Sequence, residues 1–438
     1  LQDRMKEGKV QILDYAKQTG ASFNHANPDF DGSLSDVELF SALKLIIEYE
    51  TGITIPATHN GLGYNNLIFM SLLLAKMQVN SDGNYLGSNA KVFPILAIEE
   101  PEAHLHPAMQ YKFLKFLKEN KDVKKKVRQI FITTHSTQIT SAVSLDEIIC
   151  LHSENDILSV GYPGKAFSET DEDKKSKAYV QRFLDATKSD MLFAQKVILV
   201  EGIAEELLLA TMAKYIGHSL EDSHIAVINV GGRYFSHFIK LFDTSNPYSI
   251  PKKVICLTDR DPSRKKRNGG QHFEKCYPYE YCCEVANYEY AENAEDIINA
   301  FNANDTIHFF SQDKLKSKTF EYDLILHNPT LDILVTDSMK NQEEIKELMT
   351  NNYSDALNKL RTSAENERIA QSLEASSWDE EEKKKALVAS RYLNSVGKGE
   401  NALELCSILE ENLLLPANER RSFDVPQYIK DAIEWLLQ

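Results

Sequence analysis

The chain has 438 residues, 42% hydrophobic and 26% charged, which is long enough for two or three folded domains and excludes wholesale disorder. Its 49 Lys and Arg residues against 65 Asp and Glu give a net charge of −16, which excludes a generally basic nucleic-acid coat protein. Any contact with DNA must therefore come from local basic patches. The longest apolar run, residues 67–75, is shorter than the ~18–20 residues that span a bilayer, so we expect no membrane partner. The chain opens with Leu rather than Met and shows no signal pattern, and we expect its true start to be missing.

The six cysteines do not follow the spacing of a disulfide framework, and two of them lie inside apolar stretches. This usage is typical of reduced thiols and predicts a cytoplasmic protein. The alternative is a zinc site, but the cysteines nearest to one another lack a paired C-x-x-C arrangement. Its candidate ligands are His272, Cys276, Cys282 and Cys283.

The first 50 residues predict two helices, over 4–19 and 36–50, because apolar residues recur near helical spacing. Between them, residues 27–38 match a calcium-binding loop, with Gly32 at the sharp turn. The oxygen ligands would be Asn27, Asp29, Asp31 and Glu38. The alternative is an acidic surface loop in which Asp36 caps the second helix.

The next segment predicts strands over 91–98 and 129–133 and helices over 67–77 and 103–119, a rhythm typical of a parallel sheet with crossover helices. The first strand runs into Glu99 and Glu100, and two carboxylates at a strand end suit a magnesium nucleotide site. The second strand is followed by His135, which could sense a γ-phosphate. Upstream, Gly61 and Gly63 open a helix whose backbone N–H groups could hold a phosphate.

Together and in this order, these features resemble the C-terminal part of an ATP-binding-cassette ATPase of the structural-maintenance-of-chromosomes kind. The resemblance implies that Glu100 is the catalytic glutamate, that Glu99 replaces the usual Asp, and that His135 is the switch histidine. It also places Gly61 and Gly63 in a degenerate signature loop that completes a partner subunit's site. The phosphate loop G-x-x-x-x-G-K-[ST] is absent from the sequence, so we expect ATP binding only if residues before Leu1 supply it; a degenerate ATPase kept as a scaffold is the alternative.

A second α/β unit is predicted from strands over 196–200, 225–230 and 253–258 and helices over 205–216 and 234–242. Glu201 follows its first strand and Glu205 lies on the next helical turn, while Asp259 and Asp261 follow the third strand. Carboxylates gathered at one edge of a parallel sheet repel one another unless a divalent cation lies between them. We therefore predict a metal site formed by these four residues; the alternative is a set of solvated strand-end acids that cap helices.

This pattern resembles the Toprim domain, and a Toprim domain behind a cassette-type ATPase resembles the OLD (overcoming lysogenization defect) family of nucleases and the related nuclease subunit of the Gabija anti-phage system. The resemblance implies a further metal ligand, Glu321, within Thr319-Phe-Glu-Tyr-Asp-Leu324. It also implies a catalytic lysine, Lys398, within Ser395-Val-Gly-Lys-Gly-Glu400. Two Mg²⁺ or Mn²⁺ ions would then serve phosphodiester hydrolysis.

A run of four basic residues directly follows the Asp-x-Asp pair and predicts a mobile loop that contacts the DNA backbone. Its members are Arg264, Lys265, Lys266 and Arg267.

We therefore predict an α/β protein: a helical segment over 1–50, the C-terminal part of an ABC-type ATPase over 51–160, a linker over 161–190, a Toprim nuclease domain over 191–330 and a helical region over 331–438 that completes it. The expected function is that of a metal-dependent DNA endonuclease regulated by ATP and Mg²⁺ at the ATPase module, and used against phage. The alternative is a non-nuclease ATPase that acts as a DNA clamp or in DNA repair. Because cassette ATPases pair their sites, we expect a homodimer or higher homo-oligomer, with room for a further defence protein or nucleic acid.

Overall fold

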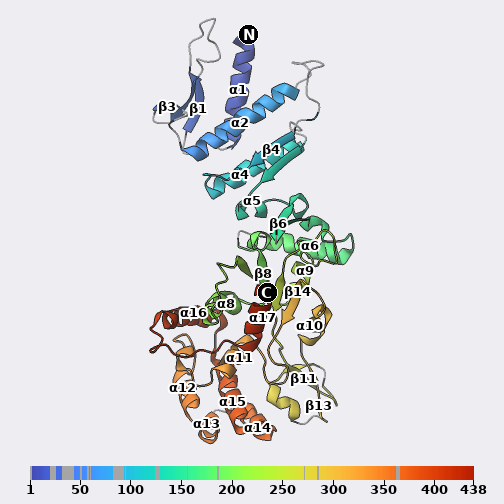
Figure 1. Ribbon diagram of the computed structural model, residues 1–438, viewed down its shortest axis with the longest axis vertical. Helices are drawn as coiled ribbons and strands as arrows, with labels where there is room; N and C mark the ends of the chain where they lie inside the picture. Colours follow the sequence, from blue (N-terminus) through green and yellow to red (C-terminus); the bar gives the residue numbers. More distant parts are fainter. Residues whose placement is uncertain are drawn as a thin grey trace. The chain divides into compact units, whose positions relative to one another are not determined.

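The computed structural model of the protein describes residues 2–19, 26–31, 44–49, 52–56, 59, 61–81, 93, 95–123, 129–154, 156–184, 187–270, 272–283, 286–361 and 366–438. The chain divides into two compact units, Leu1–Ser144 and Leu145–Gln438, and each is described by itself (Figure 1). Within the described residues, no helix is both long enough and apolar enough to cross a membrane.

Unit 1 packs helices against a pair of parallel strands. Its elements are α1 (Gln2–Thr19), β1 (Ala26–Asp31), β2 (Lys44–Tyr49), β3 (Thr54–Pro56), α2 (Leu62–Ser81), β4 (Ile95–Glu99), α4 (Pro107–Lys118), β5 (Gln129–Thr133) and α5 (Thr137–Ser141). Strands β4 and β5 run parallel with Glu99 opposite Thr133, so both strands end at the same edge. Leu96 and Ile98 of β4 point into a core that α2 and α4 share, with Phe113 at its centre.

The N-terminal segment differs from its prediction because part of it folds as a sheet. The predicted helix over 36–50 is wrong at its C-terminal half: residues Lys44–Tyr49 form β2, which pairs antiparallel with β1 and β3. The β-branched and aromatic residues of this stretch favour a strand once a partner strand is present.

The predicted calcium loop begins in strand β1 rather than in a loop. Asn27, Asp29 and Asp31 lie in β1, where the backbone is extended and alternate residues are about 6–7 Å apart. The Asp29 carboxylate instead forms an ion pair with Lys9 Nζ at 2.7 Å. The remaining part of that loop, residues 32–38, lies outside the described residues.

Unit 2 is built on a parallel four-stranded sheet in the order β14-β10-β8-β9. The strands are β8 (Lys196–Val200), β9 (Ile225–Asn229), β10 (Val254–Leu257) and β14 (Ile307–Phe310). Alternate residues of β8 face opposite sides: Ile198 and Val200 join one hydrophobic core, and Val197 and Leu199 join another. This double burial explains why the strand is apolar without interruption.

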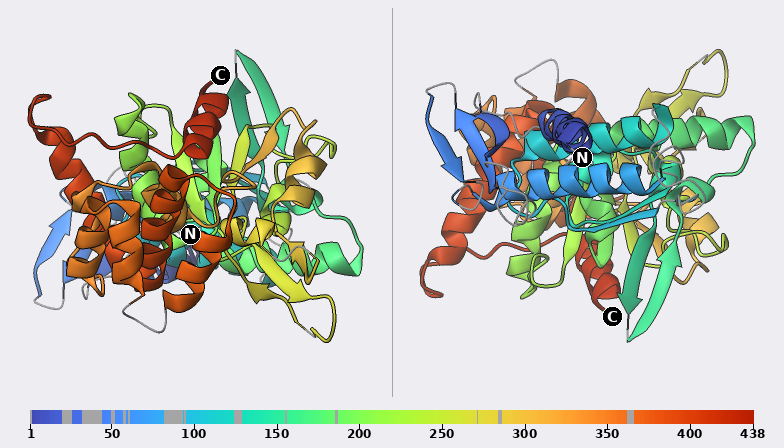
Figure 2. Two further views of the ribbon diagram at one scale, coloured as in Figure 1. Left: turned by 90° about the horizontal axis from the view of Figure 1, so that it is seen from below. Right: turned by 90° about the horizontal axis from the view of Figure 1, so that it is seen from above.

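Helices cover both faces of this sheet. The helices around the strands are α8 (Ile203–Tyr215), α9 (Phe235–Ile239), α10 (Glu295–Phe301) and α17 (Gln427–Leu437). The helices after β14 are α11 (Phe320–His327), α12 (Gln342–Thr350), α13 (Tyr353–Leu360), α14 (Glu367–Ala375), α15 (Glu380–Ser395) and α16 (Lys398–Leu414). Figure 2 shows α12 to α15, drawn in orange, gathered into one cluster, and each of the other three contacts α15. Residues of these helices share one core with β8 and β10, so the C-terminal helices belong to the same unit as the sheet.

The segment predicted as a linker, residues 161–190, is folded into unit 2. It follows the hairpin β6 (Cys150–Glu154) and β7 (Ile157–Gly161) and contains α6 (Asp171–Phe183), with α7 (Asp190–Phe193) directly after it. Thr170 caps α6 by accepting a hydrogen bond from Asp173 N at 3.3 Å, and Val180 is fully buried. The acidic run that suggested a linker lies in the first turn of α6, where negative charge stabilises the helix dipole.

Candidate functional site

Carboxylates meet at the carboxyl edge of the unit 2 sheet. Glu201 follows β8, and Asp259 and Asp261 follow β10, which pairs with β8 so that Val200 lies opposite Leu257. Parallel strands end at one edge, so these residues are brought together by the pairing alone. Glu205 reaches the same edge from the first turn of α8.

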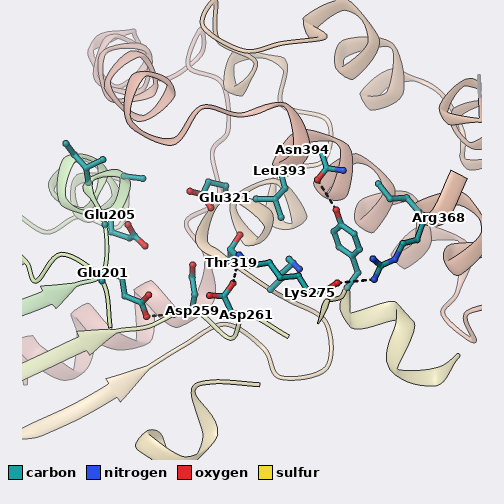
Figure 3. Close-up of a pocket in the computed structure, with 17 residues that line it drawn as sticks. Glu201, Glu205, Asp259, Asp261, Lys275, Thr319, Glu321, Arg368, Leu393 and Asn394 are labelled. Carbon is teal, nitrogen blue, oxygen red and sulfur yellow. Dashed lines mark hydrogen bonds and ion pairs between the residues drawn. The ribbon is translucent and has the colours of Figure 1, made fainter. Parts of the chain in front are cut away.

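The five predicted metal ligands line one cavity of about 740 Å³. They are Glu201, Glu205, Asp259, Asp261 and Glu321. Figure 3 shows their side chains directed toward a shared space, to which α11 contributes Glu321. Elements separated by more than a hundred residues in the sequence therefore supply one acidic wall.

Glu201 is fixed by donors from the neighbouring strand end. Its Oε1 accepts hydrogen bonds from Thr258 Oγ1 at 2.5 Å and from the backbone N–H of Asp259 at 3.1 Å. Burial raises the pKa of the Glu201 carboxyl, and the negative charge of Asp261 raises it further. A nearby cation would relieve both effects.

Asp259 is oriented by a glutamine that sequence analysis did not find. Its Oδ1 accepts from Gln312 Nε2 at 2.7 Å and from Phe320 N at 2.9 Å, and only 8% of the residue is exposed. Gln312 follows β14, a strand of four residues that contains a histidine and was not predicted. The only signal in the sequence is the short apolar stretch Ile307–Phe310.

Asp261 has a strained backbone. Its φ of 46° lies in the left-handed region, which is uncommon for a residue with a side chain. The backbone N–H of Asp261 donates to Lys318 O at 3.1 Å, and Lys275 Nζ lies 4.0 Å from Oδ1. Such conformations persist where surrounding contacts hold them, often at functional sites.

The residues fit a divalent cation by their chemistry, because hard oxygen donors dominate one wall of the cavity. In the conformation described here, however, no three Asp, Glu, His or Cys side chains of the described residues are gathered closely enough to hold one ion. The hydrogen bonds that Glu201 accepts from Thr258 and from Asp259 N both end at Oε1. In this metal-free conformation, hydrogen-bond donors stabilise the carboxylates of Glu201 and Asp259.

The resemblance implies roles for Glu321 and Lys398. Glu321 lines this cavity, and the helix that begins at Lys398 starts beside it. Glu321 is in the first turn of α11 and is 3% exposed. Lys398 is the first residue of α16, and its side chain lies outside the described residues. A Cβ built on the next residue, Gly399, would lie 3.6 Å from Ile203, which lines the cavity.

The basic run after Asp261 is not the loop that we predicted. Residues Ser263–Lys266 form strand β11, which pairs antiparallel with β12 (Glu274–Lys275) and β13 (Tyr288–Ala291). Arg264 points inward and forms an ion pair with the fully buried Glu280 at 3.2 Å. Its charge is therefore used within the protein, and its side chain is not a free DNA contact.

The other three residues of the basic run differ in how exposed their side chains are. Lys265 forms an ion pair with Glu289 at 3.4 Å, whereas Lys266 and Arg267 are exposed. Arg267 Nε donates to Tyr288 O at 3.2 Å. The surface available to a nucleic acid is thus narrower than the sequence suggests.

In unit 1, the residues predicted for the nucleotide site gather at the ends of β4 and β5. Glu99 is the last residue of β4, and Glu100 follows with a left-handed φ of 41°. His135 Nε2 lies 3.4 Å from Glu100 Oε1, and both side chains are mostly exposed. The histidine and the glutamate therefore lie close together at the ends of these two strands.

A third glutamate, which we did not predict, organises the same turn. Glu102 Oε1 accepts hydrogen bonds from Thr134 Oγ1 and from His135 N, each at 2.7 Å. Gly63 packs so closely on the turn that a Cβ there would lie 2.2 Å from His104 O, whereas Gly61 has no neighbour within 4 Å of such an atom. The first turn of α2 and the Glu100–His104 turn therefore form one structure.

Two stretches of the chain match known protein families. Residues 2–140 match the AAA ATPase domain family, and residues 192–261 match the family described as overcoming lysogenization defect protein-like, TOPRIM domain. Four of the five cavity carboxylates fall inside the second match.

Individual proteins are similar to parts of this chain. The chain is 26% identical over 268 residues to an endonuclease GajA of Bacillus cereus, covering 53% of this chain and 36% of that protein. It is 25% identical over 195 residues to an OLD nuclease of Thermus scotoductus, covering 44% and 34%. A solved structure of the C-terminal region of the Burkholderia pseudomallei OLD protein covers 56% of this chain and 98% of that one, at 21% identity and a TM-score of 0.30.

The chain spans about a third of the length of the curated relatives that it matches. Within that part, an AAA ATPase domain precedes an OLD-like Toprim domain, and the chain is homologous to the OLD nucleases and the GajA endonucleases.

Proposed function

We propose that this protein is a metal-dependent DNA endonuclease that hydrolyses phosphodiester bonds at the carboxylate cavity and is regulated by nucleotide at its ATPase domain. One observation carries the proposal. Five carboxylates, from the segments that follow β8 and β10 and from α8 and α11, line one cavity at the carboxyl edge of a parallel sheet. The homology to proteins named as nucleases supports the same activity, and it implies dependence on a divalent metal.

The metal ligands in this proposal are Glu201, Glu205, Asp259, Asp261 and Glu321. The preferred ions are two Mg²⁺, with Mn²⁺ as a substitute, because the donors are hard oxygens. When bound, such ions supply activation of water and stabilisation of the leaving 3′ oxygen. Lys398 is the proposed lysine that stabilises charge on the phosphate, since its helix begins beside the cavity.

The proposed DNA contacts outside the cavity are the two exposed members of the basic run, Lys266 and Arg267. Substituting Lys266 with Gln should weaken DNA binding uniformly across sequences and leave stability unchanged, because its side chain is exposed. Substituting Arg264 with Met should instead destabilise the protein, since it leaves the buried Glu280 with one fewer partner. Thermal unfolding together with DNA-binding titrations separates the two effects.

The ATPase domain is the proposed regulatory module. Glu100 and His135 would act at the γ-phosphate, Glu99 would face the Mg²⁺ of ATP, and Gly61 and Gly63 would face a partner subunit's nucleotide. This division of the site between subunits predicts a homodimer or higher homo-oligomer. A role in defence against phage, with or without a further protein or nucleic-acid partner, is part of the proposal and rests on the likeness to GajA.

A non-nuclease ATPase that acts on DNA is the second candidate. It is favoured by one observation: among the described residues, the acidic side chains are not gathered into a set that could hold an ion. In that case, Glu201 and Asp259 would serve only the hydrogen bonds that they make now.

A plasmid assay tests the proposal against this alternative. The full-length protein is incubated with supercoiled plasmid and Mg²⁺, Mn²⁺ or Ca²⁺, with and without ATP. We expect nicking or linearisation that depends on the metal and is lost in Asp259→Ala but not in the control Asp222→Ala, whose side chain is exposed on the same unit. Metal-dependent cutting that survives Asp259→Ala would reject the assigned site, and no cutting under any metal would favour the ATPase alternative.

A further inference from the structure

The carboxylate cavity has a cationic side as well as an acidic one. Figure 3 shows Glu201 and Glu205 at one end of the cavity and Lys275 and Arg368 at the other, with Asp261 and Thr319 between them. Lys318 also lines this cavity. Metal binding accounts for the acidic end alone and leaves the cations unexplained.

The backbone at Lys275, on a strand of only two residues, is held by hydrogen bonds from two basic side chains. Arg368 Nη2 donates to the backbone carbonyl of Lys275 at 3.0 Å, and Lys318 Nζ donates to the carbonyl of the next residue, Cys276, at 2.5 Å. The buried Lys318 and the half-buried Arg368 thus hold the backbone at Cys276 and Lys275. The side chain that this backbone carries is 81% exposed, and its Nζ lies 4.0 Å from Asp261 Oδ1.

Arg368 is itself held in place. Its guanidinium forms a two-bond contact with the fully buried Glu280, with Nε to Oε1 at 3.0 Å and Nη2 to Oε2 at 2.9 Å. Because Glu280 holds Arg368 and Arg368 holds the Lys275 carbonyl, the backbone that carries the lysine side chain is fixed by a chain of charge-assisted contacts.

Thr319 adds a second, independent observation on the same cavity. It precedes α11 at the position where a threonine usually caps a helix, but its hydroxyl makes no capping hydrogen bond. The residue is 5% exposed, lines the cavity, and its Oγ1 has no hydrogen-bond partner. A buried hydroxyl left without a partner costs about 1–3 kcal/mol, so its retention beside a cavity points to a ligand that satisfies it.

We propose that Lys275 and Thr319 form a phosphate-binding corner of the carboxylate cavity, which receives the non-bridging oxygens of the DNA strand being cut. This inference rests on the proposed nuclease function and assigns the substrate side of the same site. The ammonium of Lys275 pairs with phosphate charge, and the Thr319 hydroxyl donates to a phosphate oxygen after rotation about its Cα–Cβ bond. Lys318 and Arg368 are positioning residues, since Lys318 Nζ donates to the Cys276 carbonyl and Arg368 donates to Glu280 and to the Lys275 carbonyl.

Phosphate fits this corner better than a second metal does. A cation would be repelled by Lys275, Lys318 and Arg368, whereas a phosphodiester placed between bound metal ions and these cations is attracted from both sides. Lys275 Nζ also lies 4.0 Å from Oδ1 of a proposed metal ligand, Asp261, so one phosphate could contact both Lys275 and a metal ion held by that carboxylate.

Binding of DNA without cutting tests the corner directly. A fluorescein-labelled 20-base-pair duplex is titrated with the full-length protein in Ca²⁺, at several NaCl concentrations, and fluorescence anisotropy gives Kd. We expect Thr319→Val to bind about 10-fold more weakly with an unchanged salt dependence, because the lost group is neutral. Thr319→Ser, which keeps the hydroxyl, should bind like the wild type.

Lys275→Gln should change the salt dependence itself. Loss of one phosphate contact lowers the slope of log Kd against log salt by about 0.9. The control Lys346→Gln, at a lysine of α12 whose side chain is 43% exposed, should leave the slope unchanged. Thermal unfolding of each variant verifies that it is folded. Equal affinity and slope for the wild type, Thr319→Val and Lys275→Gln would overturn the inference.

Two further readouts separate the inference from neighbouring explanations. If Thr319→Val lost Mn²⁺ binding as Asp259→Asn does, the hydroxyl would serve the metal, and the phosphate assignment would be wrong. If the wild type bound DNA through Lys275 and Thr319 but never cut it, the corner would stand and the nuclease proposal would fail. If the wild type cut DNA and both variants bound it normally, only the corner would fail.

Discussion

Gln312 offers a quantitative test of how the acidic wall is held. Its Nε2 donates to Asp259 Oδ1 at 2.7 Å and its Oε1 accepts from Arg260 N at 3.2 Å, with 1% of the residue exposed. Gln312→Leu keeps the size but removes these two bonds, together with the one that Oε1 accepts from Ser311 Oγ at 3.2 Å. A buried hydrogen bond to a charged group contributes about 1.5–3 kcal/mol and a neutral one about 1 kcal/mol, so we expect a loss of about 3 kcal/mol in the free energy of unfolding.

The same substitution should weaken metal binding, because Asp259 loses the group that sets its orientation. Loss of such a supporting contact typically lowers metal affinity 10- to 100-fold. The assays are urea unfolding without metal and Mn²⁺ titration. The matched control is Gln371→Leu, which removes an exposed amide-to-carboxylate bond to Glu367 at 2.8 Å and should change stability by less than about 0.5 kcal/mol.

The result that would refute this reasoning is a Gln312→Leu variant as stable as the control variant and equal to the wild type in Mn²⁺ affinity. Asp259 would then be positioned without help from Gln312, by contacts that include the backbone N–H of Phe320.

Two further predictions concern packing and pH. Gly63→Ala should destabilise unit 1 by about 2 kcal/mol, because the new Cβ would meet His104 O at 2.2 Å, while Gly61→Ala, with open space around it, should be nearly neutral in urea unfolding. The hydrogen bond from Lys240 lowers the pKa of Asp173 to about 2, so Lys240→Met should cost stability above the usual Asp pKa of about 4. That difference from the wild type should vanish as the pH falls toward 2, and a difference that persists at pH 2 in thermal unfolding would contradict the assignment.

Residues at strand ends were predicted well because their placement depends on local sequence and on one topological rule. Strands β5 and β8 have the predicted bounds, since each is a short apolar run that ends in polar residues. Once parallel pairing is assumed, Glu201 and Asp259 must lie at one edge of the sheet. The positions of Glu201 and Asp259 follow from these facts, whereas Glu205 and Glu321 reach the cavity from helices α8 and α11.

Features that depend on distant partners could not be read from local patterns. β2 is a strand because β1 and β3 pair with it. β14 has only four residues, so its sequence alone does not predict a strand, and it is recognised by its pairing with β10. Arg264 resembles a DNA contact in the sequence, but the fully buried Glu280 holds it inside the protein. Gln312 carries no motif, and its role depends entirely on where β14 ends.

The central claim is that the carboxylates of the cavity hold divalent cations, and a comparison of adjacent glutamates on α8 tests it most directly. Glu205 lines the cavity, whereas Glu206 does not and instead accepts a hydrogen bond from Asn229 at 3.1 Å. Mn²⁺ binding, followed by electron paramagnetic resonance, should be weakened at least 10-fold in Glu205→Gln and unchanged in Glu206→Gln. Equal Mn²⁺ binding by the wild type and both variants, or no binding by the wild type, would contradict the claim.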